Sequence, residues 1–295
     1  MTPDTLLLAF DDEAPLARGL AEALGCPLAF VERHRFPDGE TRLRLPHALP
    51  PRVVLLRGLQ DPNAKLTELL LAAGGARELG ARRLLLVAPY LAYMRQDMAF
   101  TPGEVVSQRV LGQLLAGSFD AVVTVDPHLH RIRSLDEVLP GRRGVALSAA
   151  VLLGGLVARQ VPGALLLAPD EEAGQWVRAA AEAHGLDPAI CHKQRHGDRE
   201  VDVALPSVNV AGRAVVLLDD VASTGRTLIA AARGALAGGA ASVDVAVTHA
   251  LFIGAAFDEV KAAGVRHVWS SDCVRHPSNA VSVVPLVAEA LRGLG

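Results

Sequence analysis

The chain has 295 residues, of which 51% are hydrophobic and 21% are charged, and its formal net charge is −3 at pH 7. This composition excludes intrinsic disorder, and the slightly acidic balance argues against a dedicated nucleic-acid-binding protein, which is usually basic. At about 150 residues per domain, the length indicates two domains or one large one.

The cysteines and the N-terminal segment predict a cytoplasmic protein. Cys26, Cys191 and Cys273 form no CxxC pair, which disfavours a zinc ribbon or a redox dithiol and fits a reducing compartment. The first residues lack the basic segment of a signal peptide, and the longest uncharged stretch, 144–158, is shorter than the roughly 20 residues that span a membrane. We therefore expect neither nucleic acid nor a membrane as a partner.

Short apolar runs alternate along the chain with longer segments rich in Ala and Leu. Runs without polar alternation are typical of parallel strands buried on both faces. They occur at 5–10, 53–57, 83–88, 121–125, 164–168, 214–218, 243–248 and 265–269. Between them, helices are expected at 61–79, 105–115, 172–184 and 227–236. The alternation predicts an α/β fold with mainly parallel, doubly wound sheets.

Four of the predicted strands end in polar turns, two in each half of the chain, and these turns begin at Pro89, Asp126, Pro169 and Asp219. Ligands bind beyond the carboxyl ends of strands in such sheets, so each turn is a candidate site. Pro and Gly residues near 140–144 punctuate the chain, and we predict similar α/β domains at 1–145 and 146–295. The last predicted helix, 287–295, could pack back on the first half.

The segment 215–227 carries the most specific chemistry. A predicted strand delivers two adjacent aspartates, and a Ser-Thr-Gly turn then leads into a helix whose N-terminal N–H groups suit a phosphate. Carboxylates repel phosphate, but they accept hydrogen bonds from sugar hydroxyls or bind a metal that bridges to phosphate. The pattern predicts a site for a phosphorylated sugar; an ordinary capped strand–turn–helix is the alternative. The candidate residues are Asp219, Asp220, Ser223, Thr224, Gly225, Arg226 and Thr227.

This segment resembles the phosphoribosyl-diphosphate-binding loop of type I phosphoribosyltransferases and of ribose-phosphate diphosphokinases. Five further segments resemble the second family, in family order: 35–40 (RFPDGE), 89–97, 124–128, 193–195 and 248–252. The resemblance implies two phosphoribosyltransferase-like domains, the first binding ATP and the second ribose 5-phosphate. It also implies the activity, which is transfer of the β,γ-diphosphoryl group of ATP to the C1 hydroxyl of ribose 5-phosphate, with Mg²⁺ as cofactor.

For ATP, the resemblance implies residues of the first and second matching segments: Phe36, Asp38, Gly39, Glu40, Arg95, Gln96 and Asp97. Phe36 offers an aromatic wall to adenine, while Asp38 and Glu40 can accept hydrogen bonds from adenine or ribose. Arg95 can pair with a phosphate. Taken locally, Pro-Asp-Gly is also a strong β-turn signal, and the Arg–Asp pair could be an ordinary surface ion pair.

For catalysis, the resemblance implies Lys193, Arg195 and His128, with Arg195 also on the ribose-phosphate side, and it implies His128 and Asp170 as ligands of Mg²⁺. His130 could share the role of His128. The stretch 191–200 has no apolar periodicity and is predicted to be a loop that could close over the triphosphate. Locally, a half-buried histidine that caps a helix and a solvated basic loop are the alternatives.

The chain also departs from the family pattern. Glu171 and Glu172 follow Asp170, whereas well-studied relatives have two glycines close behind that aspartate, and such carboxylates should repel a phosphate unless a metal or water intervenes. Ser223 and Arg226 also differ, at little cost to phosphate binding. The segment 98–104 lacks the basic cluster of strongly regulated members, which predicts weak or absent inhibition by ADP at an allosteric site.

Two rival functions remain open at the sequence level. One is a non-catalytic homologue that binds the same ligands and regulates a partner, although Lys193, Arg195 and His128 are all present. The other is a phosphoribosyltransferase acting on a base, which predicts one such domain with a hood rather than two similar halves. Family members form homo-oligomers, so the resemblance also implies a dimer or larger assembly.

Overall fold

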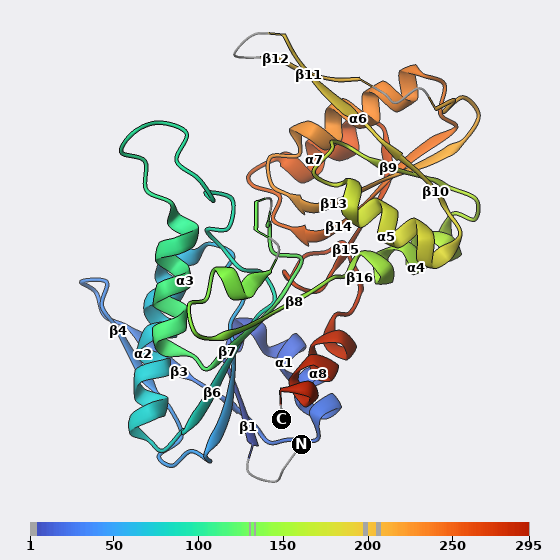
Figure 1. Cartoon of the computed structure of the whole chain (residues 1–295). Coiled ribbons are helices and arrows are strands. Elements are labelled where there is room, and N and C mark those ends of the chain that lie inside the picture. The colour runs from blue at the N-terminus through green and yellow to red at the C-terminus, as the bar shows by residue number, and fades with distance from the viewer. Residues whose placement is uncertain (1–4, 130, 133, 197–199, 205–207, 295) are drawn as a thin grey trace. The chain divides into compact units, whose positions relative to one another are not determined.

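The computed structural model describes residues 5–129, 131, 132, 134–196, 200–204 and 208–294, with the backbone alone for 192–196 and 200–204. The chain forms two compact units (Figure 1). Unit 1 comprises Met1–Leu147 together with Val283–Gly295, and unit 2 comprises Ser148–Ser282. Each unit contains a six-stranded sheet in which every pair of neighbours is parallel.

In unit 1 the strand order is β2-β1-β5-β6-β7-β8. These strands are β1 (Thr5–Ala9), β2 (Leu28–Phe30), β5 (Arg52–Leu56), β6 (Arg83–Ala88), β7 (Ala121–Val125) and β8 (Arg143–Leu147). The helices are α1 (Ala14–Leu24), α2 (Pro62–Glu78), α3 (Ser107–Ser118) and α8 (Val284–Gly293). Figure 1 shows α2 and α3 on one side of this sheet and α1 and α8 on the other.

The apolar strands of unit 1 bury both faces, as continuous hydrophobic runs predict. Leu8 and Leu55 pack with Leu69 of α2 and Leu111 of α3 in one cluster. On α8, the buried side chains are Val287, Ala288 and Leu291. Arg52 of β5 donates a hydrogen bond from Nη2 to the carbonyl oxygen of Leu291 over 3.1 Å. The C-terminal helix therefore completes the unit that contains the N-terminal strand.

In unit 2 the strand order is β10-β9-β13-β14-β15-β16. These strands are β9 (Leu165–Ala168), β10 (Asp187–Ile190), β13 (Ala214–Ala222), β14 (Ser242–Ala250), β15 (Val265–Ser271) and β16 (Asn279–Val281). The helices are α4 (Ala150–Gln160), α5 (Gly174–His184), α6 (Arg226–Ala237) and α7 (Ala256–Ala262). Alternate residues of β13 face opposite layers: Leu217 packs with Leu228 of α6, and Leu218 packs with Val177 of α5.

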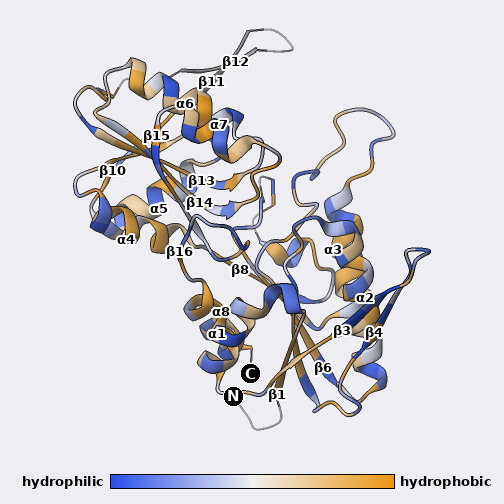
Figure 2. Ribbon diagram, turned by 180° about the vertical axis from the view of Figure 1, so that it is seen from behind, coloured by the Kyte–Doolittle hydropathy of each residue, from blue (hydrophilic) through white to orange (hydrophobic). Residues whose placement is uncertain are grey.

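Two antiparallel hairpins lie outside the main sheets. In unit 1, β3 (Glu32–Arg35) pairs with β4 (Thr41–Arg44), and Figure 2 shows this hairpin as a largely hydrophilic ribbon. In unit 2, β11 (His192–His196) pairs with β12 (Glu200–Ala204). The prediction of a loop over 191–200 is therefore wrong. A two-stranded ribbon satisfies its backbone groups by cross-strand hydrogen bonds and needs no apolar periodicity on the first strand.

The structure confirms the predicted α/β class with two mainly parallel sheets, and each of the eight predicted runs contains a strand. The short outer strands β2, β8, β10 and β16 are the members of the sheets that the apolar runs did not indicate. Nearly all of their residues are half-buried or exposed, so they need no continuous apolar run. Within the described residues, no helix combines the length and the apolar character needed to cross a membrane.

Candidate functional site

The phosphate-binding candidate of unit 2 is a turn between β13 and α6. Strand β13 runs through Asp219 and Asp220 to Ala222, four residues beyond the predicted run. Gly225 follows with φ 72°, and a Cβ there would lie 2.8 Å from Cγ2 of Val260. Only glycine meets both demands at low cost. The turn therefore requires glycine for its backbone and for its packing.

The N-terminus of α6 presents the donors that an anion needs. Its N-cap is Gly225, and no side chain caps the helix by a hydrogen bond. The first N–H groups of a helix have no partner within the helix and carry a partial positive charge. Thr224 and Arg226 are exposed, while Ser223 and Thr227 are half-buried. The sequence-predicted residues of this turn thus form one contiguous anion-binding arrangement.

Three carboxylates lie together at the carboxyl ends of β9 and β13. Burial raises the pKa of Asp219 well above its usual range, and the charges of Asp220 and Asp170 raise it further. Leu217 of β13 is in register with Leu167 of β9, which brings Asp219 level with the start of the turn that carries Asp170. Asp220 and Asp170 are themselves buried. The cluster therefore favours a bound cation or hydrogen-bond donors from a ligand.

The turn after β9 holds Asp170 and the two glutamates that depart from the family pattern. Oδ1 of Asp170 accepts a hydrogen bond from the backbone N–H of Ala173 over 3.1 Å, just before α5 begins. Glu171 and Glu172 are exposed. In the part of the chain that is described, no three His, Cys, Asp or Glu side chains form a ready-made metal-binding group. The predicted metal residues Asp170 and His128 belong to different units.

The predicted catalytic residues Lys193 and Arg195 lie on β11, where the backbone alone is described. Lys193 is paired with Val203 and Arg195 with Val201 of β12. Lys193 and Arg195 therefore occupy alternate backbone positions of a paired strand, and the Lys-x-Arg spacing alone did not predict that pairing.

In unit 1, the predicted ATP residues of the first segment form the tip of the β3–β4 hairpin. The backbone N–H of Phe36 donates to the carbonyl oxygen of Glu40 over 2.8 Å, and Oδ1 of Asp38 accepts from the N–H of Glu40 over 3.1 Å. Gly39 has φ 97°. The Phe36 ring is 38% exposed and meets the His34 ring edge-on at 4.7 Å between centroids. The tip therefore displays an aromatic face and two exposed carboxylates.

A pocket of about 650 Å³ lies between this hairpin and α2. Gly39 and Glu40 line it from the hairpin side, together with Arg33 and Arg35, and α2 contributes Glu68 and other residues. Phe36 and Asp38 are not among its lining residues. At the hairpin tip, Gly39 and Glu40 thus line the pocket, while Phe36 and Asp38 are exposed outside it.

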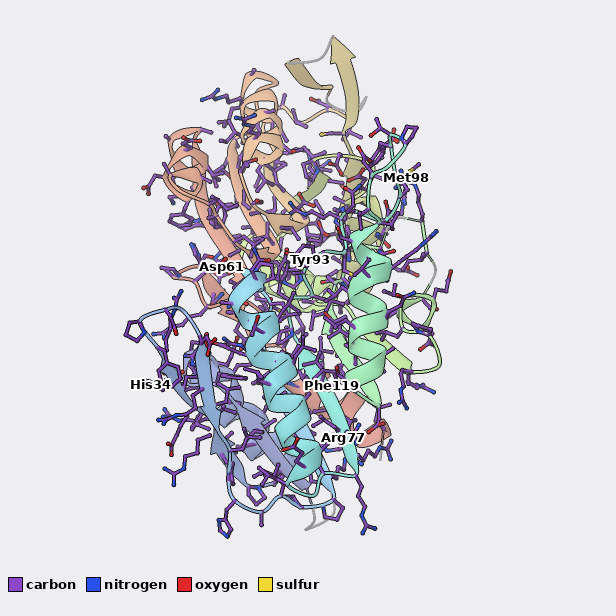
Figure 3. All side chains as sticks on the ribbon, turned by 90° about the vertical axis from the view of Figure 1, so that its left-hand side faces the viewer. His34, Asp61, Arg77, Tyr93, Met98 and Phe119 are labelled. Carbon is purple, nitrogen blue, oxygen red and sulfur yellow. The ribbon has the colours of Figure 1, made fainter. Side chains whose placement is uncertain are left out.

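The second predicted ATP segment follows β6. Arg95 is exposed, whereas Gln96 is half-buried and donates from Nε2 to the carbonyl oxygen of Met98 over 3.1 Å. The side chain of Asp97 is 1% exposed, and its Oδ1 accepts from Nη1 of Arg131 over 2.6 Å. Figure 3 shows Met98, next to this segment, well away from His34 on the hairpin. The two predicted ATP segments are therefore separate surfaces within unit 1.

His128 lies beyond the end of β7, where its family segment predicts it. Asp126 has φ 38°, an uncommon backbone conformation for a residue other than glycine. His128 itself is half-buried. Its neighbour His130 lies outside the described residues. Strands β6 and β7 are parallel neighbours, so the loops that carry Asp97 and His128 leave the same edge of the sheet.

Sequence reasoning missed a buried ionic cluster at the carboxyl ends of β1 and β5. Arg57 is 1% exposed, its Nη1 lies 2.6 Å from Oδ1 of Asp12, and its Nη2 bonds to Oε2 of Glu68. The guanidinium also lies 4.2 Å from the centroid of the Phe10 ring. Lys65 adds longer contacts to Asp12. Two sequence signals could have indicated this cluster: Arg57 ends one apolar run, and the acidic triplet 11–13 follows another.

The shifts in pKa within this cluster follow its charges. Burial alone would raise the pKa of Asp12, but Arg57, Arg33 and Lys65 together lower it. For Glu13, burial outweighs the nearby cations and raises the pKa. Buried ions are tolerated only when paired and hydrogen-bonded. Arg57 therefore neutralises the acidic residues of this edge from within the unit.

Family models match both units. Residues 5–118 match the N-terminal domain of ribose phosphate pyrophosphokinase, and residues 148–276 match the phosphoribosyl transferase domain. A crystal structure of phosphoribosylpyrophosphate synthetase from Mycobacterium smegmatis superimposes with a TM-score of 0.84, covering 99% of this chain and 98% of that one. The two sequences are 24% identical, so this match establishes the shared fold.

Curated relatives cover the whole chain. The ribose-phosphate pyrophosphokinase of Methanopyrus kandleri is 36% identical over 292 residues, which are 98% of this chain and 99% of the relative. The ribose-phosphate pyrophosphokinase of Halobacterium salinarum is 32% identical over 288 residues, or 97% and 100% of the two chains. With both family domains matched in order and relatives above 30% identity over nearly the whole chain, this chain belongs to the ribose-phosphate pyrophosphokinase family.

Proposed function

We propose that this protein transfers the β,γ-diphosphoryl group of ATP to ribose 5-phosphate, forming 5-phosphoribosyl 1-diphosphate and AMP. In this reaction the oxygen of the sugar C1 hydroxyl forms a bond to the β-phosphorus, the bond from that phosphorus to the oxygen of the α-phosphate breaks, and the hydroxyl loses its proton. The proposal rests on the position of Asp219 and Asp220 near the end of β13, just before the N-terminus of α6, which no side chain caps by a hydrogen bond.

Each part of that arrangement suits one part of a phosphorylated ribose. The N–H groups and hydroxyls of 223–227 would bind the 5-phosphate, because helix N-termini favour anions. Asp219 and Asp220 would accept hydrogen bonds from the ribose hydroxyls. Such bonds stabilise the ionised carboxylates, which repel one another in the cluster with Asp170. Unit 2 is thus the proposed sugar-phosphate unit.

Unit 1 is the proposed ATP unit. The exposed Phe36 ring would pack on the adenine, and Asp38 and Glu40 would accept hydrogen bonds from the nucleoside. The exposed Arg95 would pair with a phosphate, with Gln96 beside it. Because this segment and the hairpin tip are separate surfaces of one chain, they would bind the same ATP only from two copies of the chain in a homo-oligomer. His128, beyond the end of β7, and Lys193 and Arg195, on β11, would stabilise the charge that develops during transfer.

The residues present fit Mg²⁺ as the cofactor. Buried oxygen ligands such as Asp170 suit this hard cation, and Mg²⁺ is usually held by one or two carboxylates plus substrate phosphates rather than by an all-protein cage. Asp170 in unit 2 and His128 in unit 1 are each proposed as Mg²⁺ ligands, and the ion would supply charge neutralisation for the polyphosphate when bound.

A ³¹P NMR time course with ATP, ribose 5-phosphate and Mg²⁺ tests the reaction. The expected products are AMP and a sugar that carries a diphosphate on C1, in equal amounts. Formation of ADP would mean transfer of the γ-phosphoryl group alone and would contradict the proposal. Binding of both substrates without any product would instead favour the non-catalytic homologue.

The variant Lys193→Ala tests the catalytic assignment. Loss of a cation that stabilises transferring phosphoryl oxygens should reduce kcat by about 10²- to 10⁴-fold, with little change in the Kd for ribose 5-phosphate. The matched control is Lys261→Ala, because that lysine lies in α7 and bonds only to the nearby carbonyl oxygen of Arg266 among the contacts described. Equal kcat values for the two variants would remove Lys193 from the mechanism.

A further inference from the structure

Asp97 and Arg131 form an ion pair that joins two loops at the carboxyl edge of the unit 1 sheet. Asp97 follows β6 and is almost fully buried, with 1% of its side chain exposed. Arg131 follows β7, three residues after His128, and 51% of its side chain is exposed. Nη1 of Arg131 lies 2.6 Å from Oδ1 of Asp97. A buried carboxylate thus anchors a guanidinium that reaches the surface.

The geometry of the Asp97–Arg131 pair differs from that expected of an arginine that serves only to neutralise a buried carboxylate. An arginine can satisfy both oxygens of a carboxylate through its planar fork of donors. Here Oδ2 of Asp97 is buried and accepts no hydrogen bond from any described residue. The contact is therefore monodentate, and the other edge of the guanidinium is available on the exposed side. The ring of Phe100, at 5.9 Å, further limits where that guanidinium can lie.

The surrounding segment otherwise offers little positive charge. Residues 98–106 contain one charged residue, Glu104. Its carboxylate already accepts hydrogen bonds from the N–H of Phe100 and the hydroxyl of Thr101, each over 2.7 Å. These bonds lower the pKa of Glu104, so it stays ionised near neutral pH. A polyphosphate bound at the loops after β6 and β7 would draw on the cations of these loops, and in their described parts Arg95 and Arg131 are the arginines.

We propose that Arg131 binds the β,γ-phosphates of ATP and that Asp97 is a positioning residue that holds its guanidinium in place. This inference rests on the proposed function for the identity of the nucleotide. It also changes the role of Asp97, which the family resemblance implied as a nucleotide contact and which is buried against Arg131 instead. The monodentate pair lets Arg131 keep its anchor while its free donors bind phosphate oxygens.

The test compares Arg131→Gln with Arg109→Gln, using direct binding of ATP, AMP and inorganic tripolyphosphate by calorimetry. Arg109 lies exposed on α3 and serves as the matched control. Loss of a charge-assisted phosphate contact should weaken ATP and tripolyphosphate binding about 10- to 100-fold. AMP, which has no β,γ-phosphates, should bind as it does to the wild type. Arg131→Lys, which keeps the charge without the fork, should fall between, and it also covers the case in which the glutamine variant does not fold.

Asp97→Asn separates positioning from direct contact. It should raise the KM for ATP in the wild-type background. In the Arg131→Gln background it should add little, since the anchor acts only through the arginine. Additive losses would make Asp97 a direct ligand and overturn its role. Wild-type affinity of Arg131→Gln for tripolyphosphate would overturn the role of Arg131, whatever the turnover. If the wild type binds these ligands through Arg131 but forms no AMP, the proposed reaction fails and this inference stands.

Discussion

The two sheets have the same strand order, yet their corresponding strand ends carry opposite electrostatic arrangements. Counted across each sheet, the second and third strands are β1 and β5 in unit 1 and β9 and β13 in unit 2. In unit 1, Arg57 lies among the acidic side chains at this edge and holds the pKa of Asp12 below its usual value despite burial. In unit 2, the neighbours of Asp219 that raise its pKa are two further aspartates.

The difference indicates which edge is prepared for a ligand. Unit 1 satisfies its buried acids with its own arginine and lysine, so this edge gains little from an added cation or hydroxyl donor. Unit 2 holds repelling carboxylates beside an uncapped helix N-terminus, and a sugar phosphate with a metal ion would relieve that repulsion. Strained or repelling groups persist at functional sites because the ligand compensates them.

Removal of Arg57 should have the largest effect on stability. Arg57→Met leaves the buried Glu68 without its main cation and removes a partner of Asp12, whose side chain is 39% exposed; loss of one partner of a buried ion pair costs about 3–5 kcal/mol. The free energy of unfolding is measured in urea, with hydrogen exchange of peptides from each unit to assign the loss to unit 1.

Arg77→Met is the control, since its pair with Asp120 is about one-third exposed on both sides. That change should cost no more than about 1 kcal/mol. Equal losses for Arg57→Met and Arg77→Met would show that the buried cluster is not what stabilises unit 1.

Asp219→Asn should stabilise the protein, whereas Arg57→Met should destabilise it. Removing one charge from three crowded carboxylates should raise the free energy of unfolding of the ligand-free protein by about 0.5–2 kcal/mol, while turnover falls. Asp187→Asn serves as the control because it removes an exposed acid that pairs with Arg213 at 2.6 Å. A lower melting temperature for Asp219→Asn than for Asp187→Asn would contradict the assignment of this edge as a ligand site.

Much of this comparison was open to prediction from the sequence. Continuous apolar runs predict the buried parallel strands, and the position of Asp219, Asp220 and Gly225 after one of them predicts the ligand edge. Such features are local, because a strand, a turn and a helix start lie within a dozen residues. The same reasoning located the turn of Asp170.

The remaining features depend on contacts between residues far apart in sequence. Arg57 meets Asp12 across 45 positions, and Asp97 meets Arg131 across 34, so neither partner is visible in a local pattern. The ribbon of β11 and β12 was likewise missed, because cross-strand hydrogen bonds rather than side-chain periodicity hold it. Long-range pairing therefore decides which charged residues face ligands and which face each other.

The pH dependence of stability should separate the two edges. Asp12 has a lowered pKa in the folded state, so its contribution is present above its usual value of 3.8 and is lost as the pH falls through the lower folded value. Asp219 has a raised pKa, so the wild type loses stability relative to Asp219→Asn as the pH rises from 3.8 through the raised folded value. Melting temperatures of the wild type, Asp12→Asn and Asp219→Asn across this range test both signs. A pH-independent difference between the wild type and Asp219→Asn would contradict the repulsion among the carboxylates.

Glu171→Gln and Glu172→Gln should have the smallest effects. Although these acids depart from the family pattern, both are exposed, and interactions between exposed charges are largely screened beyond about 8 Å at physiological salt. Each change should alter the free energy of unfolding by no more than about 0.5 kcal/mol. The Mg²⁺ concentration for half-maximal activity should likewise move little, whereas Asp170→Asn should raise it strongly. A large gain in Mg²⁺ or ribose 5-phosphate affinity on removing either glutamate would instead show that the surface glutamates add to the repulsion within the aspartate cluster of unit 2.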